Sequence, residues 1–122
     1  MSFYTSTQAV TQIAQTVPNL TGGTNGKVVR ISASNTCADA SYNNTSSQLN
    51  AVLVKSGDVY YSSGLVGGFS GLTPGTSYFL NIDGTLIATA PTPSTSIRSL
   101  YIGFAVTSTS IIFKPGIPIT GV

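Results

Sequence analysis

Short runs of β-branched and aromatic residues, separated by turn-forming residues at roughly every 8 to 12 positions, fill most of this 122-residue chain. This spacing is typical of a β-sandwich or β-barrel, because each short strand must end in a tight turn before the next can pair with it. We therefore predict an all-β domain, a small β-barrel or sandwich of about seven to eight short strands. The length allows one hydrophobic core.

The strand-like runs start after Asn25-Gly26 and continue to Lys114. Between them, residues 33–50 are polar and have few large apolar side chains, so we expect a long surface loop there. The runs that favour strands are 27–32, 51–55, 59–62, 64–71 with glycine kinks, 77–82, 85–90, 99–106 and 111–114.

Turn chemistry gives the most local predictions. Asp83-Gly84 joins two apolar runs and predicts a two-residue type I′ turn, in which both central residues have positive φ. Ser56-Gly57-Asp58 predicts a three-residue hairpin connection with Gly57 in the left-handed position. Pro74-Gly75 is a third turn signal. The predicted structural turn residues are thus Gly57, Pro74, Gly75, Asp83 and Gly84.

The N-terminal part of the chain differs from the rest. We divide the chain into an N-terminal arm and connector, 1–26, and a β domain, 27–122. Apolar residues at helical spacing in 7–17, followed by Pro18, predict a short helix, although the β-branched content also suits an extended arm. The arm has no charge, and its large side chains are the predicted partner-binding residues: Phe3, Tyr4, Val10, Ile13 and Val17. The alternative is that these residues cap the chain's own barrel.

Composition excludes most catalytic chemistry. Charged residues make up 7% of the chain, there is no histidine, and there is a single cysteine, Cys37. The carboxylates are Asp39, Asp58 and Asp83, and we assign the last two to turns. A histidine base, a Ser/His/Asp triad or a zinc site cannot be built from this set within one chain. We therefore expect no enzymatic activity, no metal and no cofactor.

The charge pattern also limits the partners. Five isolated cations give a net charge of +2 and form no basic cluster, so nucleic acid is not an expected partner. The N-terminus has no secretory-signal pattern, and no run approaches the ~18 apolar residues of a membrane span. We expect a protein made in the cytoplasm with no membrane association. Its polar surface comes mainly from 17 serines and 17 threonines.

One motif resembles part of a known fold. Leu72-Thr-Pro-Gly-Thr-Ser-Tyr78 is similar to the Leu-x-Pro-x-Thr-x-Tyr corner of fibronectin type III domains, where the tyrosine hydroxyl bonds back to upstream backbone. Those domains pack a tryptophan in the core, and this chain has none.

A longer series of motifs resembles the small β domain of tailed-bacteriophage virion proteins, which occurs in head decoration proteins, head fibres and tail fibres. The resemblance covers residues 26–114 and brings no catalytic or metal-binding residues. Its elements are Asn25-Gly-Lys-Val-Val29, Gly71-Leu-Thr-Pro-Gly-Thr-Ser-Tyr-Phe-Leu80, Asp83-Gly84, Pro91-Thr92 and Ile102-Gly-Phe-Ala-Val-Thr107.

This resemblance implies a structural virion protein, most simply a capsid decoration (cement) protein that binds the outer surface of the head and stabilises it. The implied partners are the major capsid protein or another virion protein, and further copies of the chain in a homotrimer. The implied location is the virion, after assembly in the host cytoplasm. The alternative is a tail- or head-fibre module that binds a receptor or glycan. Four tyrosines are candidates for stacking on a sugar ring, but without a tryptophan or an acidic cluster beside them packing or a subunit interface is favoured: Tyr60, Tyr61, Tyr78 and Tyr101.

Overall fold

The computed structural model describes residues 13–121. Within this range the chain forms twelve strands and one short 3-10 turn, so the prediction of a small all-β domain is confirmed. Seven of these strands have four or more residues. They are β3 (Lys27–Ala33), β4 (Thr36–Asp39), β5 (Val52–Ser56), β6 (Val59–Val66), β7 (Ser77–Leu80), β10 (Tyr101–Thr107) and β11 (Ser110–Phe113).

Five further strands have only two residues each: three pair with longer strands, and the other two pair with each other. Such short pieces lie below the length at which an apolar alternation can be recognised in a sequence. They are β1 (Gln15–Thr16), β2 (Thr21–Gly22), β8 (Leu86–Ile87), β9 (Arg98–Ser99) and β12 (Ile119–Thr120), and the 3-10 turn is η1 (Gln48–Asn50).

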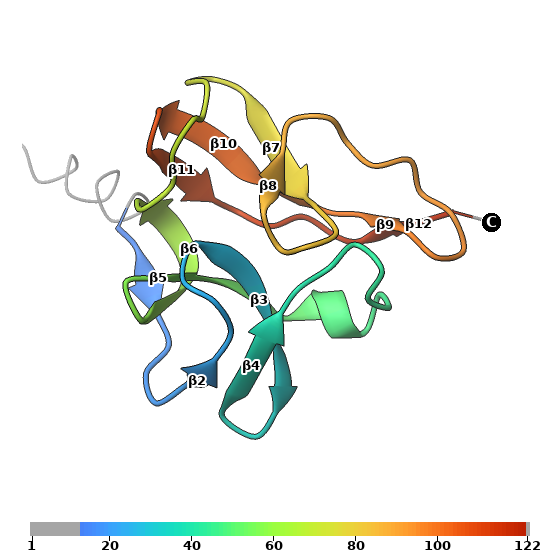
Figure 1. Ribbon diagram of the computed structural model, residues 1–122, viewed down its shortest axis with the longest axis horizontal. Coiled ribbons are helices and arrows are strands. Elements are labelled where there is room, and N and C mark those ends of the chain that lie inside the picture. Colours follow the sequence, from blue (N-terminus) through green and yellow to red (C-terminus); the bar gives the residue numbers. More distant parts are fainter. Residues whose placement is uncertain (1–12, 122) are drawn as a thin grey trace, which may run out of the picture.

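One sheet contains ten of the strands and folds into two layers (Figure 1). Its order is β2-β4-β3-β5-β6-β11-β10-β7-β8, with β1 also paired to β6. Strand β6 belongs to both layers: its first residues pair with β5, and Gly64–Val66 pair with β11. Gly64 has φ +95°, which marks the bend between the two layers. Strands β9 and β12 form a separate pair.

The main core lies between the two layers. Strand alternation turns Val28 and Val54 of the first layer toward Ile111 and Phe113 of the second, and each of these side chains is at most 1% exposed. The buried members of this cluster are Val28, Ala40, Leu49, Val52, Val54, Val66, Tyr78, Leu80, Leu100, Ile102, Ala105, Ile111 and Phe113.

A second apolar cluster lies on the opposite face of the first layer. Val29, Cys37, Leu53 and Tyr60 form it, and they alternate along their strands with residues of the main core. Chain N-terminal to β3 covers this cluster, with Val17 and Leu20 packed against it. The first layer therefore has buried side chains on both faces.

Some residues on the N-terminal side of the boundary predicted at residue 26 pair with the sheet of the β domain. Strand β1 pairs with β6, and β2 pairs in parallel with β4, so residues 15–22 belong to the β domain. The predicted helix does not reach residues 15–17, because Thr16 lies in a strand and the Val17 N–H donates to the Tyr60 carbonyl at 2.9 Å. The β-branched side chains and the backbone hydrogen-bonding groups of β6 favour the extended conformation here. Residues 7–12 of that helix prediction lie outside the described range.

The predicted surface loop 33–50 is partly ordered into regular structure. It contains β4 and η1, and Leu49 of η1 is 1% exposed in the main core. Strand β4 reads Thr-Cys-Ala-Asp, in which Cys37 is the one buried side chain. Pairing with β3 on one side and β2 on the other compensates for this weak apolar signal.

The two hairpin turns have the reverse of the predicted types. Gly57 and Asp58 have φ of +59° and +63°, and Ser56 pairs directly with Val59, which makes this a two-residue type I′ turn. The loop between β7 and β8 has three residues, 82–84, because the Asn81 N–H donates to the Thr85 carbonyl at 2.9 Å. Only Gly84 of that loop has positive φ, at +87°.

The Asp83 side chain explains the second difference. Its carboxylate accepts the Thr85 N–H at 3.1 Å and the Thr85 hydroxyl at 2.5 Å. This local arrangement keeps Asp83 out of the positive-φ region that a type I′ turn would require. The same hydrogen bonds from Thr85 hold the pKa of the Asp83 carboxyl below its usual range.

The Pro74-Gly75 turn has type II geometry. The Thr76 N–H donates to the Thr73 carbonyl at 3.1 Å, and Gly75 has φ +82°. Directly after it, the Tyr78 hydroxyl accepts the Thr73 N–H at 2.9 Å. The backward hydrogen bond of the corner motif is therefore present, with Tyr78 7% exposed.

Replacing Tyr78 with phenylalanine should lower the free energy of unfolding by about 1 to 2 kcal/mol, because the Thr73 N–H loses its acceptor in a partly buried site. Urea unfolding of both proteins measures this difference. Tyr61→Phe is the control, since Tyr61 is a half-buried tyrosine packed against the same core. Equal losses in the two variants would contradict a special role for the Tyr78 hydroxyl.

Candidate interaction surface

The ionisable side chains do not converge on a catalytic or metal centre. Among residues 13–121 there is no group of three or more His, Cys, Asp or Glu side chains that could bind a metal ion. The Cys37 thiol is buried, and burial raises its pKa, so the reactive thiolate is disfavoured. Asp83 is bonded within its own turn, and Asp58 accepts a hydrogen bond from the Asn25 amide at 3.2 Å.

Most of the remaining charges lie on the first layer, while Arg98 lies in β9 and the exposed Lys114 directly follows β11. Asp39 lies 3.9 Å from the Lys27 ammonium and also accepts the Thr24 N–H at 2.7 Å. Lys55 lies 4.0 Å from Asp58. By contrast, strands β6, β7, β8, β10 and β11 contain no charged residue at all. The strands of the second layer therefore consist of apolar and neutral polar residues, with Lys114 at the end of β11.

The outer face of the second layer carries a row of large apolar side chains. Leu65 on β6 pairs with Ile112 on β11, which pairs in turn with Phe104 on β10. Their chain neighbours point into the core, so these three side chains face outward together. Val106 lies two residues further along β10. We call Leu65, Phe104, Val106 and Ile112 the outer row.

The exposure of the outer row is high for residues of this size. Leu65 is 45% exposed, Phe104 40% and Val106 46%, while Ile112 is half-buried between them. Phe79 and Tyr101 continue the face toward β7 and meet edge to face, with ring centroids 5.8 Å apart. Ser77 pairs with Phe104 in the adjacent strand. The face is apolar and uncharged at its centre, and the exposed Lys114 lies at the end of β11.

The two layers are covered differently. The outer face of the first layer lies under Val17 and Leu20, whereas the outer row keeps its exposure in the part of the chain that the structure describes. Contiguous exposed apolar residues of this kind are typical of interaction surfaces.

The described residues of the predicted arm have different roles. Val17 packs against the second cluster of its own domain, which favours the alternative that it covers the chain's own fold. Ile13 is 55% exposed and lies at the bend of β6: a side chain added at Gly64 would lie 2.6 Å from the Ile13 carbonyl oxygen. The Ile13 backbone therefore lies beside Gly64, the residue that precedes Leu65 of the outer row. Phe3, Tyr4 and Val10 lie outside the described residues.

The sequence did contain a signal for the outer row. Residues 104–106 and 111–113 are consecutive apolar residues, which is typical of strands that are covered on both faces. In this chain only the inner faces of β10 and β11 are buried by residues 13–121. The unbroken apolar runs therefore mark β10 and β11 as strands whose outer faces carry apolar side chains that residues 13–121 do not bury.

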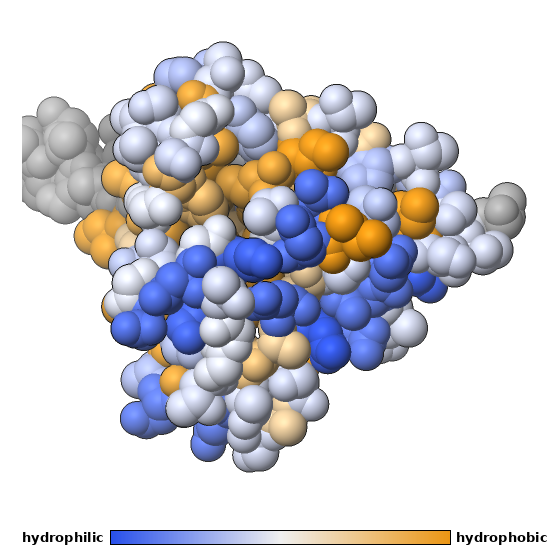
Figure 2. Space-filling view, viewed as in Figure 1, coloured by the Kyte–Doolittle hydropathy of each residue, from blue (hydrophilic) through white to orange (hydrophobic). Residues whose placement is uncertain are grey.

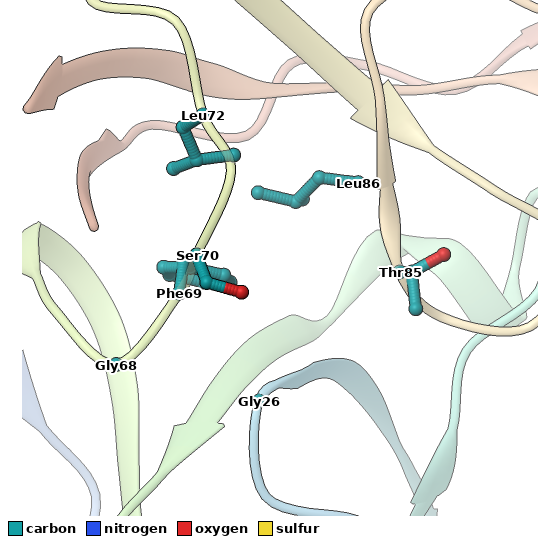
Figure 3. Close-up of a pocket in the computed structure, with 7 residues that line it drawn as sticks. All are labelled: Gly26, Gly68, Phe69, Ser70, Leu72, Thr85 and Leu86. Carbon is teal, nitrogen blue, oxygen red and sulfur yellow. The ribbon is translucent and has the colours of Figure 1, made fainter. Parts of the chain in front are cut away.

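A cavity of about 240 Å³ opens at the seam between the layers (Figure 3). Leu72 and Leu86 point toward one another across it, and Ser70 and Thr85 supply the neutral hydroxyls. Figure 2 shows hydrophobic residues gathered along this seam, with hydrophilic residues below it. The cavity lining is completed by Gly26, Gly68 and Phe69.

The candidate stacking tyrosines are mostly structural. Tyr60 and Tyr78 are 5% and 7% exposed, and the Tyr60 hydroxyl donates to the Gly22 carbonyl at 2.7 Å. Tyr61 packs against the main core, and Tyr101 packs against Phe79. These contacts favour packing over sugar stacking for all four.

No helix among residues 13–121 is long and apolar enough to span a membrane. Comparison of the chain with protein-family models, with curated proteins and with solved structures gives no match in any of the three. The function must therefore be argued from the surface itself.

Proposed function

We propose that the protein is a structural component of a tailed-bacteriophage virion, a capsid decoration protein that binds the outer surface of the head and stabilises it. In this proposal it acts as a homotrimer, and its partner on the particle is the major capsid protein. The protein makes no chemical change to its partners. The observation that carries the proposal is the uncharged second layer with its exposed outer row.

An uncharged surface suits permanent assembly for a physical reason. Burying an ion costs several kcal/mol unless it is paired well, whereas burying hydroxyls and apolar groups costs far less. The second layer offers apolar residues at its centre and serine or threonine around them, as at Ser77, Thr107 and Ser110. This is the arrangement of an apolar contact centre with a polar rim.

The motif resemblance over residues 26–114 supports the virion setting. Turns and corners that carry this resemblance also have defined structural roles: Tyr78 closes the type II turn, and Gly84 contacts the first layer. These roles of the motif residues are structural, which suits a protein that acts by binding and not by catalysis.

The seam cavity supports one alternative function, a fibre module that binds a glycan or receptor. The cavity is neutral and offers the hydroxyls of Ser70 and Thr85 beside an apolar wall. A small neutral molecule would suit it better than an ion, because no charged side chain lines it.

Imaging of purified virions that contain this protein, combined with chemical cross-linking, tests the proposal. We expect density for three copies at each decorated position of the head and cross-links to the major capsid protein. Heads stripped of the protein should regain resistance to heat when it is added back. A position on the tail, or binding to immobilised glycans that Leu72→Trp in the seam cavity abolishes, would favour the fibre alternative instead.

A further inference from the structure

We propose that the outer row is the surface through which copies of this chain bind one another. This inference rests on the proposed homotrimer and names the residues that would form its contact. In such an assembly Leu65, Phe104, Val106 and Ile112 of each copy lie against the neighbouring copies, and the charged first layer faces away from the contact.

The first argument is the electrostatics of identical partners. Every copy carries the same net charge of +2, so charged faces of two copies repel each other on close approach. Of the five cations, three lie on the first layer, one lies in the separate β9–β12 pair and one directly follows β11: Lys27, Arg30, Lys55, Arg98 and Lys114. The second layer has no charge within its strands, and like copies can therefore pack there without burying an ion.

The second argument is the shape of the surface. The register Leu65–Ile112–Phe104 crosses three adjacent strands, so the row extends about 10 Å across the sheet and its side chains stand in line. A second sheet can pack on such a row at the ~10 Å separation of stacked sheets. The β-sheet face then becomes the interior of the assembly, as in a core divided between subunits.

The third argument is the size of the contact and what lies beside it. A stable interface buries about 800 Å² on each partner, which is more than four side chains provide. Phe79 and Tyr101 extend the apolar face on the side of β7. The neighbourhood of the row thus supplies further uncharged surface for the same contact.

Sedimentation of the full chain and of two lysine variants tests this inference. Leu65→Lys places a charge in the outer row, while Ile31→Lys is its matched control on β3, with a parent side chain of similar exposure, 40% against 45%. We expect wild type and Ile31→Lys to sediment as three chains. Leu65→Lys should sediment as one chain, with association weakened at least about a hundredfold.

Every outcome of this test has a defined meaning. If wild type and Leu65→Lys are both trimers, the outer row is not the contact, but the proposed trimer stands. If the wild type stays a single chain at high concentration, both the trimer and this inference fail. A row covered by the chain's own residues 1–12, or by the capsid protein alone, would give that same single chain. Should Leu65→Lys fail to fold by circular dichroism, the milder Phe104→Ser variant decides in its place.

Discussion

Replacing Gly84 with valine is expected to lower the free energy of unfolding by about 3 kcal/mol or more. Gly84 has φ +87°, a conformation that a β-branched residue adopts only under strain. A Cβ at this position would also lie 3.1 Å from two carbonyl oxygens, those of Val28 and Ala40. The Val28 N–H donates to the Gly84 carbonyl at 2.8 Å, so the turn is tied to the first layer. Strain in this turn therefore weakens its contact with the first layer.

Gly75→Val is the control for this experiment. Gly75 has a similar φ of +82°, but nothing lies within 4 Å of the position of an added Cβ. This variant should lose only about 1 to 2 kcal/mol from backbone strain. Denaturant unfolding of the two variants separates strain from contact with the first layer. Losses of the same size would show that the contact of Gly84 with β3 contributes nothing.

The all-β fold could be predicted because the longer strands combine β-branched residues with glycine or proline turns. Strands β3 and β5 have this signature, and β7 has aromatic residues in place of the β-branched ones. The missed elements depend on long-range pairing: β4 has a single buried side chain, and β1 has none. Their strand conformation comes from hydrogen bonds to partners distant in sequence, which local composition does not encode.

Turn type was equally hard to predict, for a local reason. Gly57-Asp58 and Asp83-Gly84 use the same two residue types, and in each turn the glycine has positive φ. The difference comes from their neighbours. Thr85 follows Asp83 at the right distance to donate twice to its carboxylate, whereas the Asp58 N–H donates to the Asn25 side chain at 2.8 Å. Side-chain partners decided the backbone conformation.

The candidate interaction surface was predicted only in part. An uncharged apolar stretch near the N-terminus can be recognised in the sequence, but which of its residues bind the domain itself depends on the fold. Val17 is used internally because Tyr60 and its neighbours form an apolar cluster on the outer face of the first layer. The outer row escaped prediction because its members come from three strands that adjoin only after folding.

Two N-terminal deletions should separate the attachment of the protein from its folding. Removal of residues 2–12 is expected to leave the melting temperature nearly unchanged, because the described contacts of the β domain begin at residue 13. Removal of residues 2–17 also deletes β1, the hydrogen bond from Val17 to Tyr60, and the cover that Val17 gives to the second cluster. That loss should lower the free energy of unfolding by about 2 to 4 kcal/mol.

The shorter deletion should nevertheless abolish attachment to the head. Phe3, Tyr4 and Val10 are large apolar residues in an uncharged segment, and each contributes about 1.5 to 3 kcal/mol if it is fully covered by a partner. Even after the cost of ordering the segment, their loss should weaken head binding by more than about a hundredfold in a co-sedimentation assay. The full chain with Phe3→Ser and Tyr4→Ser is the matched test of the side chains themselves, with Ser2→Ala and Thr5→Ala as its control. Head binding by the 2–12 deletion that equals the binding of the full chain would show that the anchor lies in the β domain.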